Sequence, residues 1–123
     1  MKKLIIFSLA ILLISCNKHE RKCTDFKTGK FVFTLIIDGK KQTSITTRTN
    51  SLQIETYNGK TDTATIRWVN DCEFVLQKLH PKSMKERKAI SINIVSTNQK
   101  GYTFEYSFVG EAKKQRGSVT KID

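Results

Sequence analysis

Cysteine and histidine are the residue types in this sequence best suited to nucleophilic or metal chemistry, and both are scarce. The 123-residue chain has three cysteines, Cys16, Cys23 and Cys72, and two histidines, His19 and His80. A cysteine or serine nucleophile needs a base within hydrogen-bonding reach, and neither histidine has an evident partner. Structural zinc sites use about four Cys or His ligands at characteristic spacing. The sequence shows no such set, so it favours neither kind of chemistry.

Carboxylates offer a second route to catalysis, through a general acid and a general base. Asp71 and Glu73 flank Cys72, but we expect them on a turn and on the outward face of a strand. The chain contains neither a glycine-rich phosphate loop nor a metal-binding motif. We therefore expect a non-enzymatic protein with no cofactor and no metal.

Cys16 stands at the end of a short secretory signal. Lys2 and Lys3 precede an apolar run over residues 4–14, which is too short to span a bilayer with the usual ~20 residues. The segment Leu13-Ile14-Ser15-Cys16 resembles the lipobox that lipoprotein signal peptidase cleaves. This resemblance predicts a signal peptide over residues 1–15, and diacylglyceryl and N-acyl groups on Cys16 that anchor the chain to a membrane.

The residues after Cys16 bear on where the lipoprotein resides. Asn17 follows Cys16 in place of the aspartate that retains lipoproteins in the inner membrane. The following stretch is mainly basic, with Glu20 as its acidic residue, unlike the acidic run that directs some lipoproteins to the cell surface. We expect a lipoprotein of the outer membrane that faces the periplasm.

The other two cysteines form an even pair in an oxidising compartment. Cys23 and Cys72 are expected to form a disulfide. Closing a loop of about 50 residues would stabilise the fold by roughly 4 kcal/mol in the chain-entropy model. The alternative, a metal pair, lacks further ligands at useful spacing.

The chain is strongly basic. Of 22 Lys and Arg residues, Lys2 and Lys3 leave with the signal, so 20 remain against 11 acidic residues, a net charge of +9. Such a surface attracts anionic lipid headgroups, lipopolysaccharide phosphates and acidic polymers. Export argues against nucleic acid as the partner, and a solvated basic face that keeps the domain soluble accounts for the same charge.

The mature chain alternates apolar and polar residues with the two-residue period of strands. Asp38-Gly39 and Asn58-Gly59 are typical of two-residue hairpin turns, because both turn positions need positive φ. Residues 82–87 are the one segment with helical or loose character. Eight strands are expected, over residues 31–37, 40–48, 52–57, 61–69, 72–79, 89–97, 102–108 and 117–122.

An antiparallel meander of eight strands must bury one face of its sheet and satisfy or protect the unpaired backbone groups of its two edge strands. Closure into a small up-and-down barrel, as in lipocalins, achieves both, while an open curled sheet or a sandwich is the alternative. We expect an all-β fold with one domain over residues 29–123, preceded by a lipidated tether over residues 16–28.

One aromatic stripe has two interpretations. It could line a ligand pocket inside the barrel, with tyrosine hydroxyls and an arginine as polar groups. It could equally be the packed apolar face of two strands. The residues of this candidate pocket are Arg67, Trp68, Tyr102, Phe104, Tyr106 and Phe108.

Four segments together resemble a family of small lipoproteins of the Bacteroidetes, especially flavobacteria. They are residues 23–31 (CTDFKTGKF), 66–74 (IRWVNDCEF), 102–108 (YTFEYSF) and 113–119 (KKQRGSV). The resemblance covers essentially the whole mature chain and implies no activity. Some members carry the name DNA topoisomerase IV, which this sequence contradicts: such a subunit is many times longer, is cytoplasmic, and cuts DNA with a tyrosine beside a magnesium site.

These features predict an envelope lipoprotein that acts by binding or structural contact with an unknown envelope protein. The alternative is a lipocalin-like carrier of a small apolar or anionic ligand.

Overall fold

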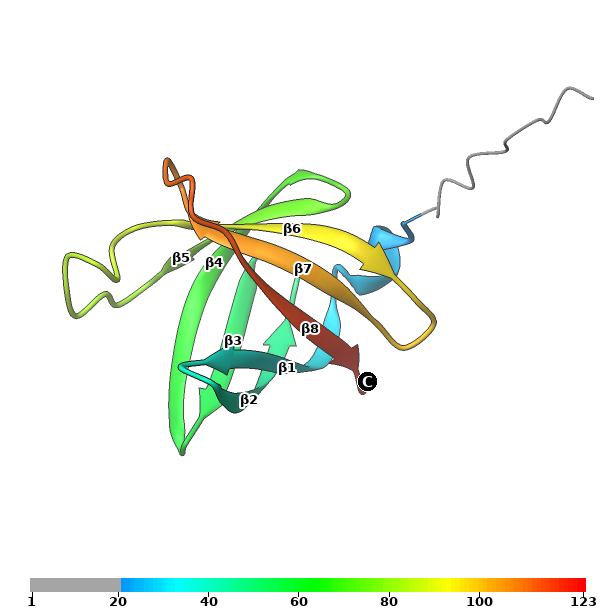
Figure 1. Ribbon diagram of the computed structural model, residues 1–123, viewed down its shortest axis with the longest axis horizontal. Helices are drawn as coiled ribbons and strands as arrows, with labels where there is room; N and C mark the ends of the chain where they lie inside the picture. Colours follow the sequence, from blue (N-terminus) through cyan, green and yellow to red (C-terminus); the bar gives the residue numbers. More distant parts are fainter. Residues whose placement is uncertain (1–20) are drawn as a thin grey trace, which may run out of the picture.

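The computed structural model describes residues 21–123, which form eight antiparallel strands in sequence order. Each strand pairs with the next, and β8 pairs back onto β1, so the sheet is a closed barrel (Figure 1). The predicted all-β up-and-down barrel is confirmed, and the open sheet and the sandwich are excluded. The strands are β1 (Gly29–Ile37), β2 (Lys40–Arg48), β3 (Leu52–Tyr57), β4 (Lys60–Asn70), β5 (Glu73–Lys78), β6 (Ile90–Thr97), β7 (Gly101–Phe108) and β8 (Gln115–Lys121).

Two of the hairpin turns have the conformation that their sequences predict. Asp38 and Gly39 have φ values of 50° and 74°, and Asn58 and Gly59 have φ values of 48° and 73°. These left-handed conformations match the twist of the flanking strands. The strand pairs β1–β2 and β3–β4 are thereby set in register. The segment over residues 82–87, expected to be helical or loose, contains turns and no helix.

Inward-facing side chains fill one half of the barrel. Phe31, Phe74, Ile94 and Phe104 are buried there with their neighbours from the other strands. Gly117 allows this packing, because a Cβ at that position would lie 2.6 Å from Cζ of the Phe104 ring. The aromatic residue thus occupies the space that a side chain on β8 would take.

A short 3-10 helix, η1 (Cys23–Phe26), covers the filled end of the barrel. Cys23 is bonded to Cys72, in the β4–β5 turn, with an S–S distance of 2.06 Å, which is the pairing expected from the sequence. Phe26 is buried and packs edge-on against Tyr102. The stretch expected to be part of a tether therefore contains a segment that belongs to the core.

The barrel has two distinct ends. The described chain begins at what we call the closed end, where η1, the turn over residues 71–72 and the turn over residues 98–100 lie (Figure 1, right). The β1–β2 and β3–β4 turns and the longer connections over residues 79–89 and 109–114 lie at the opposite, open end (Figure 1, left). The strands, helix and disulfide all lie within residues 21–123, so a chain starting at residue 17 contains everything this fold uses.

Candidate functional site

A buried arginine lies at the centre of the closed end. Arg48 is only 2 % exposed. Its Nη1 donates to the carbonyl oxygen of Phe26 at 2.8 Å, its Nη2 to the hydroxyl of Tyr102 at 2.9 Å, and its Nε to Oε1 of Gln53 at 3.1 Å. Within residues 21–123, no carboxylate forms an ion pair with it. Neutral dipoles therefore replace the water that the guanidinium loses on burial.

Aromatic rings complete the surroundings of Arg48. The guanidinium carbon lies 4.6 Å from the centre of the Phe31 ring and 4.7 Å from that of Phe74. Such cation–π contacts are strongest where water is excluded. Burial raises the pKa of Tyr102, although the nearby Arg48 charge opposes this rise, so the hydroxyl stays protonated at neutral pH. This cluster fills the interior of the barrel at the closed end, and a hollow of about 460 Å³ lies outside it, beside η1 and the turn over residues 98–100.

At the open end, the interior of the barrel is not filled. A cavity of about 570 Å³ opens to solvent between β6, β7, the start of β8 and the two long connections. We call it the mouth hollow. Ile90, Tyr106 and Phe108 form an apolar wall, because they are inward-facing residues beyond the filled half. The remaining lining residues are Met84, Lys85, Lys88, Ser107, Glu111, Lys113 and Gln115.

The mouth hollow carries an excess of positive charge. Lys88 is held by Glu111, with its Nζ 3.0 Å from Oε1, and also lies 5.9 Å from the centre of the Phe108 ring. In the part of the chain that the structure describes, Lys85 and Lys113 have no carboxylate partner. These two ammonium groups remain available to an anion beside an apolar wall.

Tyr106 supplies a neutral polar group to the same hollow. Its hydroxyl donates to Oε1 of Gln115 at 2.6 Å. Burial raises the pKa of Tyr106, so the phenol stays protonated at neutral pH and its oxygen can accept a further hydrogen bond.

Acidic residues line the other side of the open end. A smaller hollow of about 110 Å³ there shares Lys88 and Ile90 with the mouth hollow. Glu55 and Asp62 face each other across β3 and β4, and Lys78 lies 3.7 Å from Asp62 and 3.0 Å from Glu86. Burial, and then the charge of Asp62, raise the pKa of Glu55. Anion binding is therefore favoured on the side of the opening that carries Lys85 and Lys113.

The six residues of the candidate pocket are divided between the two ends. Tyr106 and Phe108 line the mouth hollow. Tyr102 and Phe104 are buried in the core, and Trp68 packs on Phe74 with ring centres 4.6 Å apart. Arg67 is exposed on the outer face of β4, away from the interior.

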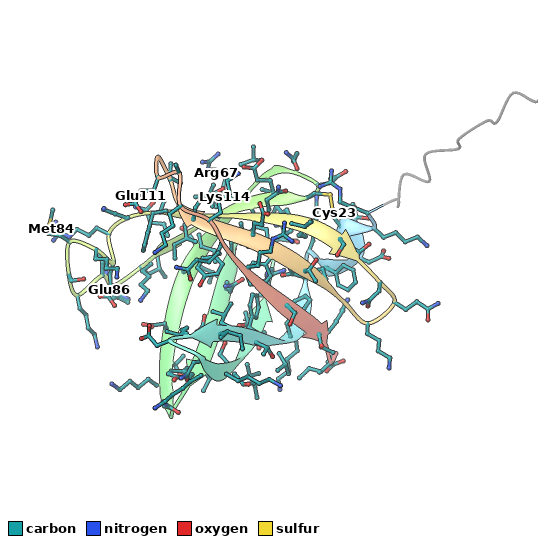
Figure 2. The ribbon with its side chains drawn as sticks, viewed as in Figure 1. Cys23, Arg67, Met84, Glu86, Glu111 and Lys114 are labelled. Atoms are coloured by element: carbon teal, nitrogen blue, oxygen red, sulfur yellow. A yellow bond between two sulfur atoms is a disulfide. The ribbon has the colours of Figure 1, made fainter. Side chains whose placement is uncertain are left out.

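Sequence reasoning did not place the lysines of the hollow beside the aromatic stripe. Lys85 and Lys113 lie on different connections, and periodicity says nothing about which connections meet. The runs of basic residues around positions 82–88 and 113–116 are the signal that could have indicated them. Figure 2 shows both connections at the end of the barrel opposite Cys23, with Met84 at the extremity of the longer one.

Other chemical features lie away from this site. Residues 21–123 contain no group of three or more Cys, His, Asp or Glu side chains that could hold a metal ion. The same residues contain no helix long and apolar enough to cross a bilayer. The predicted signal peptide, the predicted lipidation site Cys16, and His19 lie outside the described residues. No family model, curated protein or solved structure matches this chain.

Proposed function

We propose that this chain is a non-enzymatic envelope lipoprotein that binds a small amphipathic anion at the open end of its barrel. The observation that carries the proposal is the mouth hollow, where an apolar wall faces lysines without carboxylate partners. The aromatic residues of the closed end are already packed, so a ligand is expected in this hollow and not deeper in the barrel.

Size and lining support a molecule with an apolar body and one anionic group. A volume of about 570 Å³ lies within the usual range for small-molecule sites, about 300–1,000 Å³. Ile90, Phe108 and the flexible side chain of Met84 would cover an acyl or aromatic body. Lys85 and Lys113 would bind a carboxylate or phosphate through charge-assisted hydrogen bonds.

Calorimetric titration with dodecanoate tests this proposal on the chain starting at residue 17. We expect binding of dodecanoate and clearly weaker binding of dodecanol, which has the same body without the charge. Lys113→Gln should weaken dodecanoate binding about tenfold, as expected for loss of a hydrogen bond from a charged group. Lys100→Gln, in the turn at the closed end, is the matched control and should leave the affinity unchanged.

Two results would count against the proposal. One is the absence of dodecanoate binding. The other is an equal loss of affinity in Lys113→Gln and Lys100→Gln, which would mean that only the net charge matters.

The lipoprotein part of the proposal rests on the sequence around Cys16. A chain acylated there would join the membrane next to the closed end, where the described residues begin. Cys16→Ala should abolish metabolic labelling with a palmitate analogue and leave the precursor uncleaved. Continued labelling of this variant would contradict the assignment.

A further inference from the structure

The rim of the open end carries most of the exposed large hydrophobic residues. We define the rim as residues 36–41, 57–60, 79–89 and 109–114, which comprise all four connections at that end and the strand residues next to the two short turns. Nine large hydrophobic residues are exposed in the described part of the chain, and six of them lie in the rim. These six are Ile36, Ile37, Tyr57, Leu79, Met84 and Val109. Met84 is the most exposed of all nine, at 76 %.

The rim also carries most of the basic charge that is not balanced locally. It contains nine Lys and Arg residues against three acidic residues. Two of those three, Glu86 and Glu111, already form ion pairs with Lys78 and Lys88. The segments at the closed end, residues 21–28, 49–51, 70–72, 98–100 and 122–123, contain four basic residues against three acidic ones. The positive field of the domain is therefore concentrated around the mouth hollow.

Each connection carries both apolar and basic residues. Ile36 and Ile37 precede Lys40 and Lys41 across a two-residue turn. Met84 lies between Lys82 and Lys85, and Val109 is followed by Lys113 and Lys114. A lipid interface accommodates such an arrangement, because apolar side chains enter the acyl boundary while lysines extend to the phosphates. A protein partner would instead need a contiguous surface of fixed shape.

We propose that this rim docks on an anionic lipid bilayer that faces the open end, distinct from the membrane that an anchor at Cys16 would join next to the closed end. Exposed apolar side chains on four connections at one end can enter the acyl boundary, and the surplus lysines match the negative surface potential of the headgroups. The mouth hollow opens at the same end, so docking would place it next to the lipid. Part of the rim, including Met84, Lys85 and Lys113, also lines the hollow, so docking is tested separately from ligand binding at rim residues that do not line it.

Flotation with lipid vesicles tests this proposal on the unlipidated chain starting at residue 17. We expect little binding to vesicles of phosphatidylcholine alone and clear binding when phosphatidylglycerol forms about a third of the lipid. Added salt should weaken the binding, because the Debye length is about 8 Å at 0.15 M. The double variant Lys40→Glu/Lys41→Glu should lower the partition coefficient about tenfold or more. Lys30→Glu/Lys100→Glu, toward the closed end, should change it much less.

A matched valine pair separates docking from general charge effects. Val109 in the rim and Val69 near the closed end are 57 % and 52 % exposed. Val109→Asp should lower vesicle binding about tenfold, because it places a charge where an apolar side chain enters the lipid. Val69→Asp adds the same charge and should lower vesicle binding much less. Both variants should keep the melting temperature and the dodecanoate affinity of the parent, because neither residue lines the mouth hollow.

Equal losses in the two valine variants would overturn the proposal, as would equal binding to neutral and anionic vesicles. Absence of binding to anionic vesicles would also overturn it and would point to an acidic protein surface as the partner of the rim. If the chain bound dodecanoate but not vesicles, the docking proposal would be contradicted and the proposed function would stand.

Native tryptophan fluorescence adds an orientation test. The chain has a single tryptophan, Trp68, which lies toward the closed end. Vesicles with brominated acyl chains should leave its fluorescence unchanged. In a Met84→Trp variant the same vesicles should quench the added tryptophan. Quenching of Trp68 in the parent chain would contradict docking through the rim.

Discussion

Tyr102 and Tyr106 lie four residues apart on β7, and both point into the barrel, but at different depths. Tyr102 is 2 % exposed and accepts a hydrogen bond from the buried Arg48. Tyr106 is only partly buried, donates to Gln115 and lines the mouth hollow. One strand with one repeating pattern therefore provides core at one end and a candidate binding surface at the other. The difference comes from what covers each end: η1 and its disulfide at the closed end, and widely spaced basic connections at the open end.

The largest expected effect is at Arg48. Arg48→Ala would leave the Tyr102 hydroxyl, the Gln53 amide and the Phe26 carbonyl without their donor, and would open a space between aromatic rings. We expect a loss of about 3–5 kcal/mol in the free energy of unfolding. Arg116→Ala, which removes an exposed arginine paired with Glu105, should cost less than about 1 kcal/mol. Chemical denaturation measures the free energy of unfolding of both variants. Similar losses would contradict the role of Arg48 in stabilising the closed end.

The disulfide is expected to contribute almost as much to the closed end. Cys23→Ser and Cys72→Ser should each lower the free energy of unfolding by up to about 4 kcal/mol, since the bond closes a loop with a sequence separation of 49. The double variant should add little to either single change, because one bond is lost in all three cases. Thermal melts under non-reducing conditions provide the measurement. Additive losses would mean that the cysteines act independently.

Phe104 and Phe108 allow the sharpest comparison along one strand. Phe104→Ala should lower the free energy of unfolding by about 3 kcal/mol, because the ring is buried against Phe33 and Gly117. Phe108→Ala should cost clearly less stability, since Phe108 is only partly buried, but should weaken dodecanoate binding. The two variants are compared by denaturation and by calorimetric titration. If Phe104→Ala weakened binding more than Phe108→Ala in folded protein, the ligand would lie deeper than we propose.

The smallest expected effect has the opposite sign and concerns Glu55. Its pKa is raised above the ordinary value of 4.5, so the folded state binds a proton more readily than the unfolded state. The parent chain should therefore gain stability relative to Glu55→Gln as pH falls from the raised pKa to below about 4.5. At neutral pH the Gln variant should be the more stable of the two, by less than about 1 kcal/mol. Denaturation of both chains across pH 3–8 tests this, and a Gln variant less stable than the parent at neutral pH would contradict it.

The strands could be predicted because their signals are local. Alternation along β7 and the Asp38-Gly39 and Asn58-Gly59 turns depend on neighbouring residues, and the expected strand boundaries agree closely with those observed. The role of Arg48 could not be predicted, because its partners Phe26 and Tyr102 are 22 and 54 residues away. For the same reason, alternation identified the aromatic stripe but did not separate Tyr102 in the core from Tyr106 in the hollow. That separation depends on which end η1 covers.

Amide chemical shifts during a titration with dodecanoate would test the central claim most directly. We expect shift changes to concentrate in residues 84–90 and 106–115, around the mouth hollow, while the amides of Arg48, Gln53 and Tyr102 stay unchanged. Changes centred on the closed end, or spread evenly over all eight strands, would contradict the assignment of structure to one end and binding to the other.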